Sequence, residues 1–248
     1  MAGPKQTPIR VAMVLAAGFG KRMRPLTETV PKPLIPVLGV PMLDRVLDHL
    51  ERAGVRRAVV NLHHLGERVE KHLAGRTRPE IVFSPEKELL ETGGGVVKAL
   101  PELGDKPFLV ANSDAVWLDG PSSAIARLRR AWDGRRMDAL LMLYPTIAVP
   151  GYEGAGDYFM DPEGRLQRRP ARAVAPFVFT GVQILHPRLL EGAPEGRFSL
   201  VKLYDRAQDR RRLFGIRHDG EWYHVGTPET LALVEKVLAV GPSRKDWL

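Results

Sequence analysis

A cluster of glycines and basic residues follows the first apolar run of this 248-residue chain. The run Val11–Leu15 leads into two alanines and then into a turn that holds Gly18, Gly20 and Arg22. Because glycine has no Cβ, such a turn lets backbone N–H groups approach an anion closely. Lys32 stands between two prolines, on stiff backbone that suits a fixed charge directed at a phosphate. The combination predicts a site for phosphate groups.

Two known phosphate-binding loops do not match this turn. The dinucleotide-binding fingerprint has a third glycine at the position where Met23 stands. The Walker loop has a longer spacing between its glycines and ends in Lys-Ser or Lys-Thr, which this turn lacks. The predicted anion site therefore follows another pattern, with Arg22 and Lys32 as its basic side chains.

A second polar cluster, Asn112-Ser113-Asp114, comes at the end of another apolar run. In open α/β sheets, ligand-binding residues gather at the carboxyl ends of the strands. We therefore expect Asp114 to lie beside the glycine turn at one edge of a sheet.

The elements that must position these residues alternate between strands and helices over the first part of the chain. Apolar, β-branched runs predict strands, and apolar residues at helical spacing predict helices. The expected strands cover residues 11–15, 57–61, 81–84, 107–112 and 138–143, and the expected helices 41–50, 66–73, 95–100 and 122–132. Ser122 is the expected cap of the last helix, and prolines exclude a regular helix between Pro25 and Pro41. This order predicts an α/β fold with a Rossmann-like, mostly parallel sheet flanked by helices.

Beyond Pro145 the pattern changes. Residues 151–172 are polar and typical of loops, and a long strand is expected over 176–185. A helix over 200–210, strands over 213–217 and 222–225, and a helix over 228–238 follow. We expect one domain over residues 1–240 and a frayed tail over 241–248.

The composition narrows the class of protein. The chain has no cysteine, which excludes disulfide scaffolds, thiol nucleophiles and cysteine-bound zinc. No apolar run approaches the roughly 18 residues of a membrane span, and Met1–Arg10 lacks the apolar core of a signal peptide. We expect a cytoplasmic protein without a membrane partner. The basic residues behind the net charge of +8 are scattered and lack interleaved aromatics, which favours ordinary solvated surface charges. The two functional alternatives for this charge are small anionic substrates and nucleic acid, and the second rests on the charge alone.

Several segments together resemble a known enzyme family. Leu15-Ala-Ala-Gly-x-Gly-x-Arg-Met-x-Pro-Leu-Thr27 followed by Pro31-Lys-Pro-Leu34 is similar to the signature of the sugar-1-phosphate nucleotidylyltransferases. The similarity continues through Ser84-Pro85, Glu91-Thr-Gly-Gly-Gly95, Asn112-Ser-Asp114 and Val225-Gly-Thr227. Within this family, Ser84-Pro-Glu86, Leu90–Gly95 and Gly156-Asp-Tyr158 resemble the uridylyltransferases of N-acetylmuramate 1-phosphate. The resemblance implies the nucleotide-diphospho-sugar transferase fold, with a nucleotide-binding part near 9–144 and a smaller sugar-binding part near 145–227.

The implied reaction transfers a uridylyl group from UTP to N-acetylmuramate 1-phosphate and releases pyrophosphate. The attacking phosphate oxygen is already an anion, so the reaction needs positioning and charge neutralisation rather than a general base. The resemblance implies that Arg22 and Lys32 act on the triphosphate and the leaving pyrophosphate. It implies that the nucleotide contacts Ala16, Ala17, Gly18, Gly20, Glu91, Gly93, Gly94 and Asn112.

The resemblance also implies sugar-binding and metal-binding residues. The sugar side would comprise Asp157, Thr180, Gly181 and Arg169. A hard carboxylate suits a hard cation, so Asp114 is the expected ligand of Mg²⁺. Relatives place a second metal-binding aspartate where this chain has His224, a poorer ligand for magnesium. Either His224 coordinates Mg²⁺ as a neutral imidazole, or Asp114 holds the ion with phosphates and water, or another carboxylate takes the second position. His224 could also simply pack in the core.

Other functions stay open at this point. One is a guanylyl- or thymidylyltransferase that acts on mannose, heptose or glucose 1-phosphate, because main-chain contacts carry much of the base selectivity. Another is a catalytically silent subunit that senses sugar nucleotides. The sequence gives no prediction of the oligomeric state.

Overall fold

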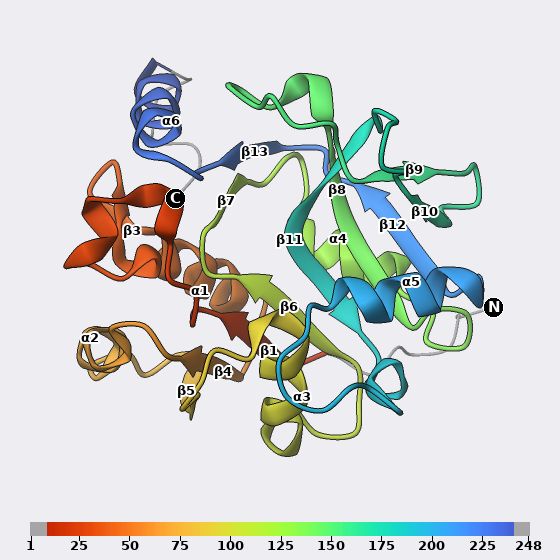
Figure 1. Ribbon diagram of the computed structural model, residues 1–248, viewed down its shortest axis with the longest axis horizontal. Coiled ribbons are helices and arrows are strands. Elements are labelled where there is room, and N and C mark those ends of the chain that lie inside the picture. Colours follow the sequence, from red (N-terminus) through yellow and green to blue (C-terminus); the bar gives the residue numbers. More distant parts are fainter. Residues whose placement is uncertain (1–8, 241–248) are drawn as a thin grey trace.

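The protein is described by a computed structural model over residues 9–240 (Figure 1). Four parallel strands, in the order β5-β4-β1-β6, form one half of the main sheet. They are β1 (Val11–Leu15), β4 (Arg57–Leu62), β5 (Glu80–Pro85) and β6 (Phe108–Asn112). Leu15 lies in register with both Asn61 and Asn112. The carboxyl ends of the three central strands therefore meet at one edge.

The other half of the sheet is attached through an antiparallel strand, β11 (Phe177–Leu185). This strand pairs with β6 on one side and with β8 (Ala139–Pro145) on the other, and β8 pairs in parallel with β12 (Leu213–Arg217). The predicted mostly parallel, Rossmann-like sheet is confirmed. The stretch predicted as loop contains two short strands, β9 (Tyr158–Met160) and β10 (Leu166–Arg168), that extend the sheet beside β11.

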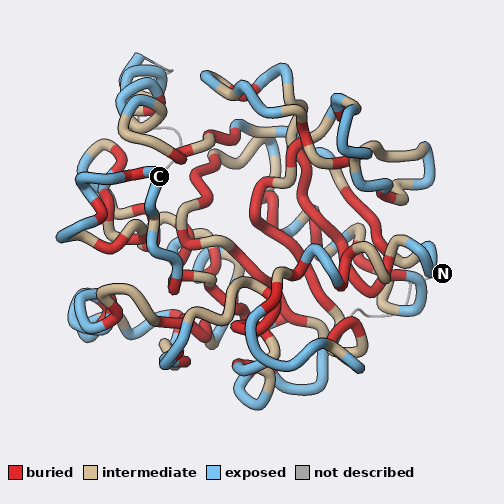
Figure 2. The backbone as a smooth tube through the Cα atoms, in the orientation of Figure 1, coloured by how far each residue is buried: buried red, intermediate tan, exposed pale blue. Residues whose placement is uncertain are grey.

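Helices cover both faces of the sheet, with α3 and α5 in front of it and α1 and α4 behind it in Figure 1. The helices are α1 (Met42–Arg52), α2 (Gly66–Leu73), α3 (Glu91–Leu103), α4 (Ala124–Ala131), α5 (Val201–Asp209) and α6 (Pro228–Val240). Strand β1 is buried on both sides, since Ala12 and Val14 join one hydrophobic core and Met13 joins the other. Figure 2 shows the buried backbone concentrated in these central strands. None of the helices described is long and apolar enough to cross a membrane.

The segment after the glycine turn is irregular, as the prolines predict. It contains three short 3₁₀ turns and the paired strands β2 (Pro36–Val37) and β3 (Val40–Pro41). A separate small core holds this segment against the strand pair β7 (Ala115–Leu118) and β13 (Glu221–His224) and against α6. Its buried members include Met23, Ile35 and Val37. The irregular segment that carries Arg22 and Lys32 therefore has a hydrophobic anchor of its own.

Two helix starts differ from the sequence prediction. Helix α4 is capped by Ser123 rather than Ser122, because the Ser123 Oγ accepts the Ala126 N–H and Asp119 accepts the Ala124 N–H. Helix α3 begins at Glu91 and not at Gly95, so the glycines lie inside it. The tail predicted over 241–248 lies outside the described residues.

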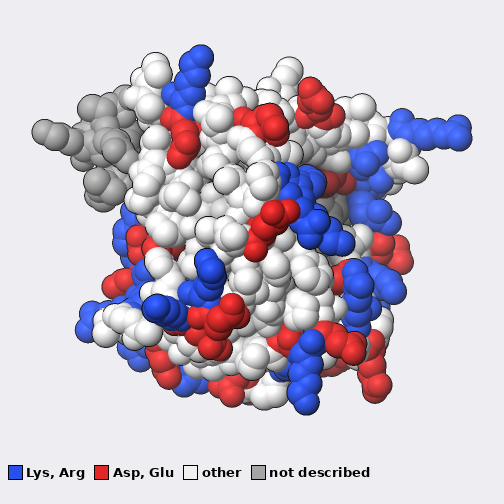
Figure 3. Space-filling view, turned by 60° about the vertical axis from the view of Figure 1, so that its left-hand side comes forward, with Lys and Arg blue, Asp and Glu red and all other residues white. Residues whose placement is uncertain are grey.

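Charged side chains of both signs are interspersed over the face shown in Figure 3. Many arginines pair with carboxylates, such as Arg76 with Asp48 and Arg168 with Asp205. The excess of basic residues therefore does not form one continuous tract on this face.

Candidate active site

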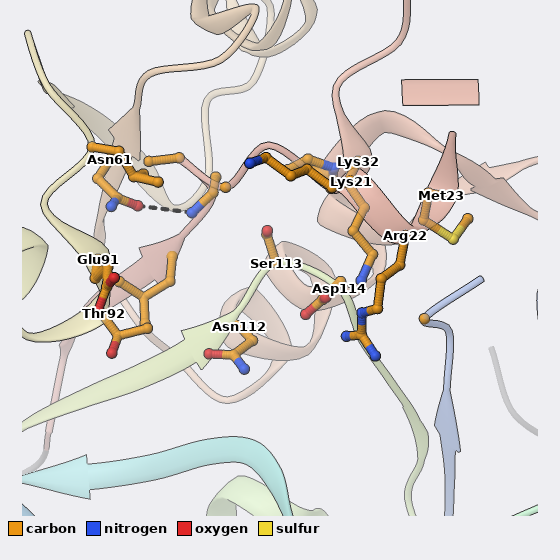
Figure 4. Close-up of a pocket in the computed structure, with 18 of the residues that line it drawn as sticks. Lys21, Arg22, Met23, Lys32, Asn61, Glu91, Thr92, Asn112, Ser113 and Asp114 are labelled. Carbon is orange, nitrogen blue, oxygen red and sulfur yellow. Dashed lines mark hydrogen bonds and ion pairs between the residues drawn. The ribbon is translucent and has the colours of Figure 1, made fainter. Parts of the chain in front are cut away.

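Two adjoining cavities open where β1, β4 and β6 end. The first has a volume of about 500 Å³ and the second about 800 Å³. Arg22, Asn112 and Asp114 line both cavities, so these side chains stand at their junction (Figure 4). The two motifs singled out in the sequence therefore meet in space.

The glycine turn and the start of α3 form the walls of the first cavity. Most of the predicted nucleotide-binding and phosphate-binding residues line it: Ala16, Ala17, Gly18, Gly20, Arg22, Lys32, Glu91, Asn112 and Asp114. Gly20 has a φ of +61°, and a Cβ built on it would lie 2.9 Å from Thr27 Cγ2 and 3.0 Å from Lys32 Cβ. Only glycine permits this close approach, which brings the backbone of the turn against Lys32.

Charge at the junction is partly neutralised and partly free. Lys32 Nζ donates to Asp114 Oδ2 at 2.5 Å, and the two side chains are 12% and 34% exposed. The Arg22 guanidinium lies beside Asp114 in Figure 4 and forms no hydrogen bond or ion pair with any residue in 9–240. An unpaired guanidinium beside a half-buried ion pair is an arrangement that attracts a polyanion.

A buried pair that the sequence analysis missed supports the first cavity. Asn61 accepts the Ala16 N–H through Oδ1 at 2.7 Å and donates through Nδ2 to Glu86 Oε1 at 2.7 Å. Glu86 also accepts the Leu90 N–H at 2.8 Å. The pair thus joins the glycine turn to the start of α3, and it occupies the Ala16 N–H. The position of Asn61 at the end of a parallel strand, like that of Asn112, is the signal that could have found it.

Gly93 and Gly94 do not line either cavity. Both donate their N–H groups to the Phe198 carbonyl oxygen, at 2.8 and 3.2 Å. A side chain on Gly93 would collide with the Phe198 ring, and one on Gly94 with the Gly196 carbonyl. These glycines therefore let the segment 196–200 pack onto α3, and Ser199 from that segment reaches the first cavity.

Three residues that were predicted to bind the sugar or the metal line the second cavity: Asp157, Thr180 and His224. Burial raises the pKa of Asp157, although its Oδ2 accepts the Phe179 N–H at 2.8 Å and Arg169 is near. The Thr180 hydroxyl donates to the Met142 carbonyl at 2.9 Å. Because the Phe179 N–H uses only Oδ2, the other carboxylate oxygen of Asp157 is left for a ligand.

Gly181 and Arg169 do not line the cavities. Gly181 packs behind Asn112, and a Cβ on it would lie 2.7 Å from the Asn112 Nδ2 atom. The Arg169 guanidinium donates to the carbonyl oxygens of Gly156, Pro170, Ala171 and Ala173. These four carbonyls hold the side chain within its own loop, which the sequence did not reveal.

Residues 11–237 match the Nucleotidyl transferase family. The chain belongs to this family. It is 42% identical over 235 residues to the N-acetylmuramate alpha-1-phosphate uridylyltransferase of Caulobacter vibrioides, covering 93% of this chain and 97% of that one. It is 36% identical over 220 residues to the enzyme of the same name from Neisseria meningitidis, covering 87% and 93%.

The fold of this nucleotidyl transferase is similar to that of solved structures. With UDP-glucose pyrophosphorylase complexed with UDP-glucose, the TM-score is 0.78 at 16% identity, covering 93% of this chain and 98% of that one. At this identity the likeness concerns the fold.

The residues of this nucleotidyl transferase fit a magnesium ion only in part. Residues 9–240 contain no cluster of three histidine or carboxylate side chains that could hold a metal. Magnesium commonly binds through one or two carboxylates together with substrate phosphates and water, and the half-buried carboxylate of Asp114, which lines both cavities, suits that mode. His224 suits a magnesium site less well because its Nε2 is directed at Gly226. A Cβ built on Gly226 would lie 2.5 Å from this nitrogen. Burial and the nearby Arg22 and Lys32 lower the pKa of His224, which favours the neutral imidazole.

Proposed function

We propose that this nucleotidyl transferase moves the uridylyl group of UTP to N-acetylmuramate 1-phosphate and yields UDP-N-acetylmuramate and pyrophosphate. The observation that carries the proposal is the pair of cavities that share Arg22, Asn112 and Asp114. Such a junction lets two anionic substrates meet over common positive charge. The choice of UTP and the muramate sugar is supported by the two relatives that bear this activity in their names and match almost end to end.

The chemistry is an exchange at the α-phosphorus of UTP. An oxygen of the sugar phosphate forms a bond to this phosphorus, and the bond from phosphorus to the oxygen shared with the β-phosphate breaks. Pyrophosphate leaves with the electron pair. No proton has to be removed from the attacking oxygen, so the protein contributes orientation and charge stabilisation.

Each side chain at the junction has a distinct part in this proposal. Arg22, unpaired in the free protein, contacts the triphosphate from the first cavity and the sugar phosphate from the second. Lys32 stabilises the charge that grows on the departing pyrophosphate. Asp114 would hold Mg²⁺, and the ion, when bound, would supply positive charge to the phosphate groups. His224 is proposed as a neutral wall of the second cavity beside that site.

The second cavity would receive the sugar. The carboxylate oxygen of Asp157 that the Phe179 N–H leaves free can accept a hydrogen bond from a sugar hydroxyl or from the N-acetyl amide. We place the reaction in the recycling of cell-wall sugars in the cytoplasm, where it would return a salvaged sugar phosphate to the nucleotide-sugar pool.

A matrix of pyrophosphate-release assays tests the proposal. Four nucleoside triphosphates are crossed with the 1-phosphates of N-acetylmuramate, N-acetylglucosamine, mannose, heptose and glucose. UTP with N-acetylmuramate 1-phosphate is expected to give the highest kcat/KM. A preference for GTP with mannose or heptose 1-phosphate would overturn the assigned substrates but not the reaction. No turnover with any pair would point to the silent sensing subunit.

A further inference from the structure

Strand β11 contains a bulge beside the second cavity, which Thr180 lines. In its pairing with β8, Phe179 lies opposite Leu143 and Gln183 lies opposite Leu141, and the register shifts between these pairs. The bulged backbone includes Thr180 and Gly181. Bulges leave ladder groups unpaired and need other partners to fix their geometry.

A tryptophan from another sheet supplies one of these partners. Trp222 lies in β13, which pairs with β7 and not with the main sheet. Its indole Nε1–H donates to the Thr180 carbonyl oxygen at 3.1 Å, and both residues are buried. The Thr180 hydroxyl ties the same residue to the Met142 carbonyl in β8. Hydrogen bonds to β13 and to β8 therefore both fix the position of Thr180 in the bulge.

The bulge in turn sets the surface against which Asn112 packs. Gly181 has a φ of +84°, and the position of its missing Cβ lies 2.7 Å from Asn112 Nδ2 and 2.9 Å from Asn112 Cγ. The Asn112 amide therefore fills the space that a side chain at position 181 would need, next to the backbone of the bulge. Asn112 lines both cavities, beside Arg22 and Asp114.

We infer that Trp222 is a positioning residue for Asn112 and acts through its indole N–H and the β11 bulge. The inference rests on the proposed function, since it assigns a part in that reaction. Because the Thr180 carbonyl is buried, loss of the indole N–H leaves it without this donor, and the bulge relaxes. Small misplacements at a reacting centre cost up to about 10²-fold in rate.

Trp222→Phe tests the inference because it keeps an aromatic ring and removes the N–H. Trp117→Phe is the matched control. Trp117 is similarly buried and donates its Nε1–H to Asp119 at 3.2 Å, but, unlike Trp222, which lines the second cavity, it lines neither cavity. Both variants are expected to lose some thermal stability. Only Trp222→Phe is expected to lower kcat, by about 10-fold or more, with little change in the KM for UTP. Equal kcat values in the two variants would overturn the inference.

Two further measurements separate this inference from the proposed function. Trp222→Phe combined with Asn112→Ala is expected to lower kcat no further than Asn112→Ala alone, and additive losses would contradict the relay. The side-chain amide resonance of Asn112, assigned by its disappearance in Asn112→Ala, is read without any substrate. It is expected to shift in Trp222→Phe and not in Trp117→Phe. If the wild-type protein turned over no substrate pair, the proposed function would fail, while this shift would still decide the positioning role.

Discussion

In the free protein Lys32 forms an ion pair with Asp114, and we propose that it acts on the phosphate groups of the bound nucleotide. Its Nζ lies 2.5 Å from Asp114 Oδ2 at the junction of the cavities. If it stabilises charge that develops on the leaving pyrophosphate, Lys32→Ala should lower kcat by about 10² to 10³-fold. Steady-state kinetics of pyrophosphate release measure this, with Lys71→Ala on the exposed side of α2 as the control. A near-normal kcat with only a raised KM would make Lys32 a uniform binder.

Asp114 carries the proposed metal site. Asp114→Asn keeps the shape of the side chain but removes the charge that would hold a cation against phosphate oxygens. Activity is expected to fall by about 10² or more, and added magnesium should restore only part of it. The assay is a magnesium titration of turnover, with the exposed Asp209→Asn as the control. A wild-type magnesium dependence in Asp114→Asn would refute the assignment.

At the scale of elements, Gly93 and Gly94 of α3 are glycines because the segment 196–198 packs against them. In a helix interior without such a constraint, a change from glycine to alanine stabilises by about 1 kcal/mol. In Gly93→Ala the new methyl group would meet the Phe198 ring, so the free energy of unfolding should fall by about 1 to 3 kcal/mol. Urea denaturation measures the change. Gly75→Ala, where a Cβ would meet nothing within 4 Å, is the control. A stabilised Gly93→Ala would contradict the packing role.

Most strands of the main sheet and the glycine turn could be predicted from the sequence because each is a local pattern. Val11–Leu15 is an apolar run that ends in glycine, and β1 has those bounds. Strand β7 was missed because it follows β6 after only Ser113 and Asp114 and pairs with β13, about a hundred residues away. The glycine run of α3 resembles a loop entry because glycine lowers helix propensity. Side chains at Gly93 and Gly94 would collide with the distant segment 196–198, and this contact cannot be predicted from the local sequence.

The residues of the candidate site likewise fall into those that a local sequence pattern predicts and those whose position depends on the folded structure. Arg22, Lys32 and Asp114 were found from the types and spacing of neighbouring residues, and they do line the first cavity. Arg169 was expected at the sugar because the resemblance to the family implied it. Its hydrogen bonds to carbonyls of its own loop depend on how that loop closes, which no local pattern encodes.

At the scale of the whole molecule, stability is expected to fall below neutral pH. Burial lowers the pKa of three histidines, His186, His218 and His224. The unfolded chain binds protons at these residues near pH 6.5, whereas the folded protein binds them only at lower pH. The stability that they contribute is therefore complete above about pH 6.5 and is lost as the pH falls. The lowered pKa values of Asp119 and Asp138 act in the same direction but only at more acidic pH.

Chemical denaturation between about pH 7.5 and pH 5.5 measures this slope. His218 is 1% exposed, and its burial lowers its pKa although the carbonyl oxygens of Leu118 and Glu221, which its Nε2 contacts, act in the opposite direction. A His218→Gln variant keeps a donor for these carbonyls but does not titrate, and its stability should depend less on pH. A wild-type protein whose unfolding free energy stays constant over this range would contradict the expectation.

Transfer at the junction of the two cavities is tested most directly by a crystal structure of the protein with UDP-N-acetylmuramate bound. The uridine is expected in the cavity of about 500 Å³ and the muramate sugar in the cavity of about 800 Å³. The diphosphate should lie between them, in contact with Arg22 and beside Asp114. A sugar ring bound outside the second cavity, or a diphosphate that Arg22 does not contact, would contradict transfer at this junction.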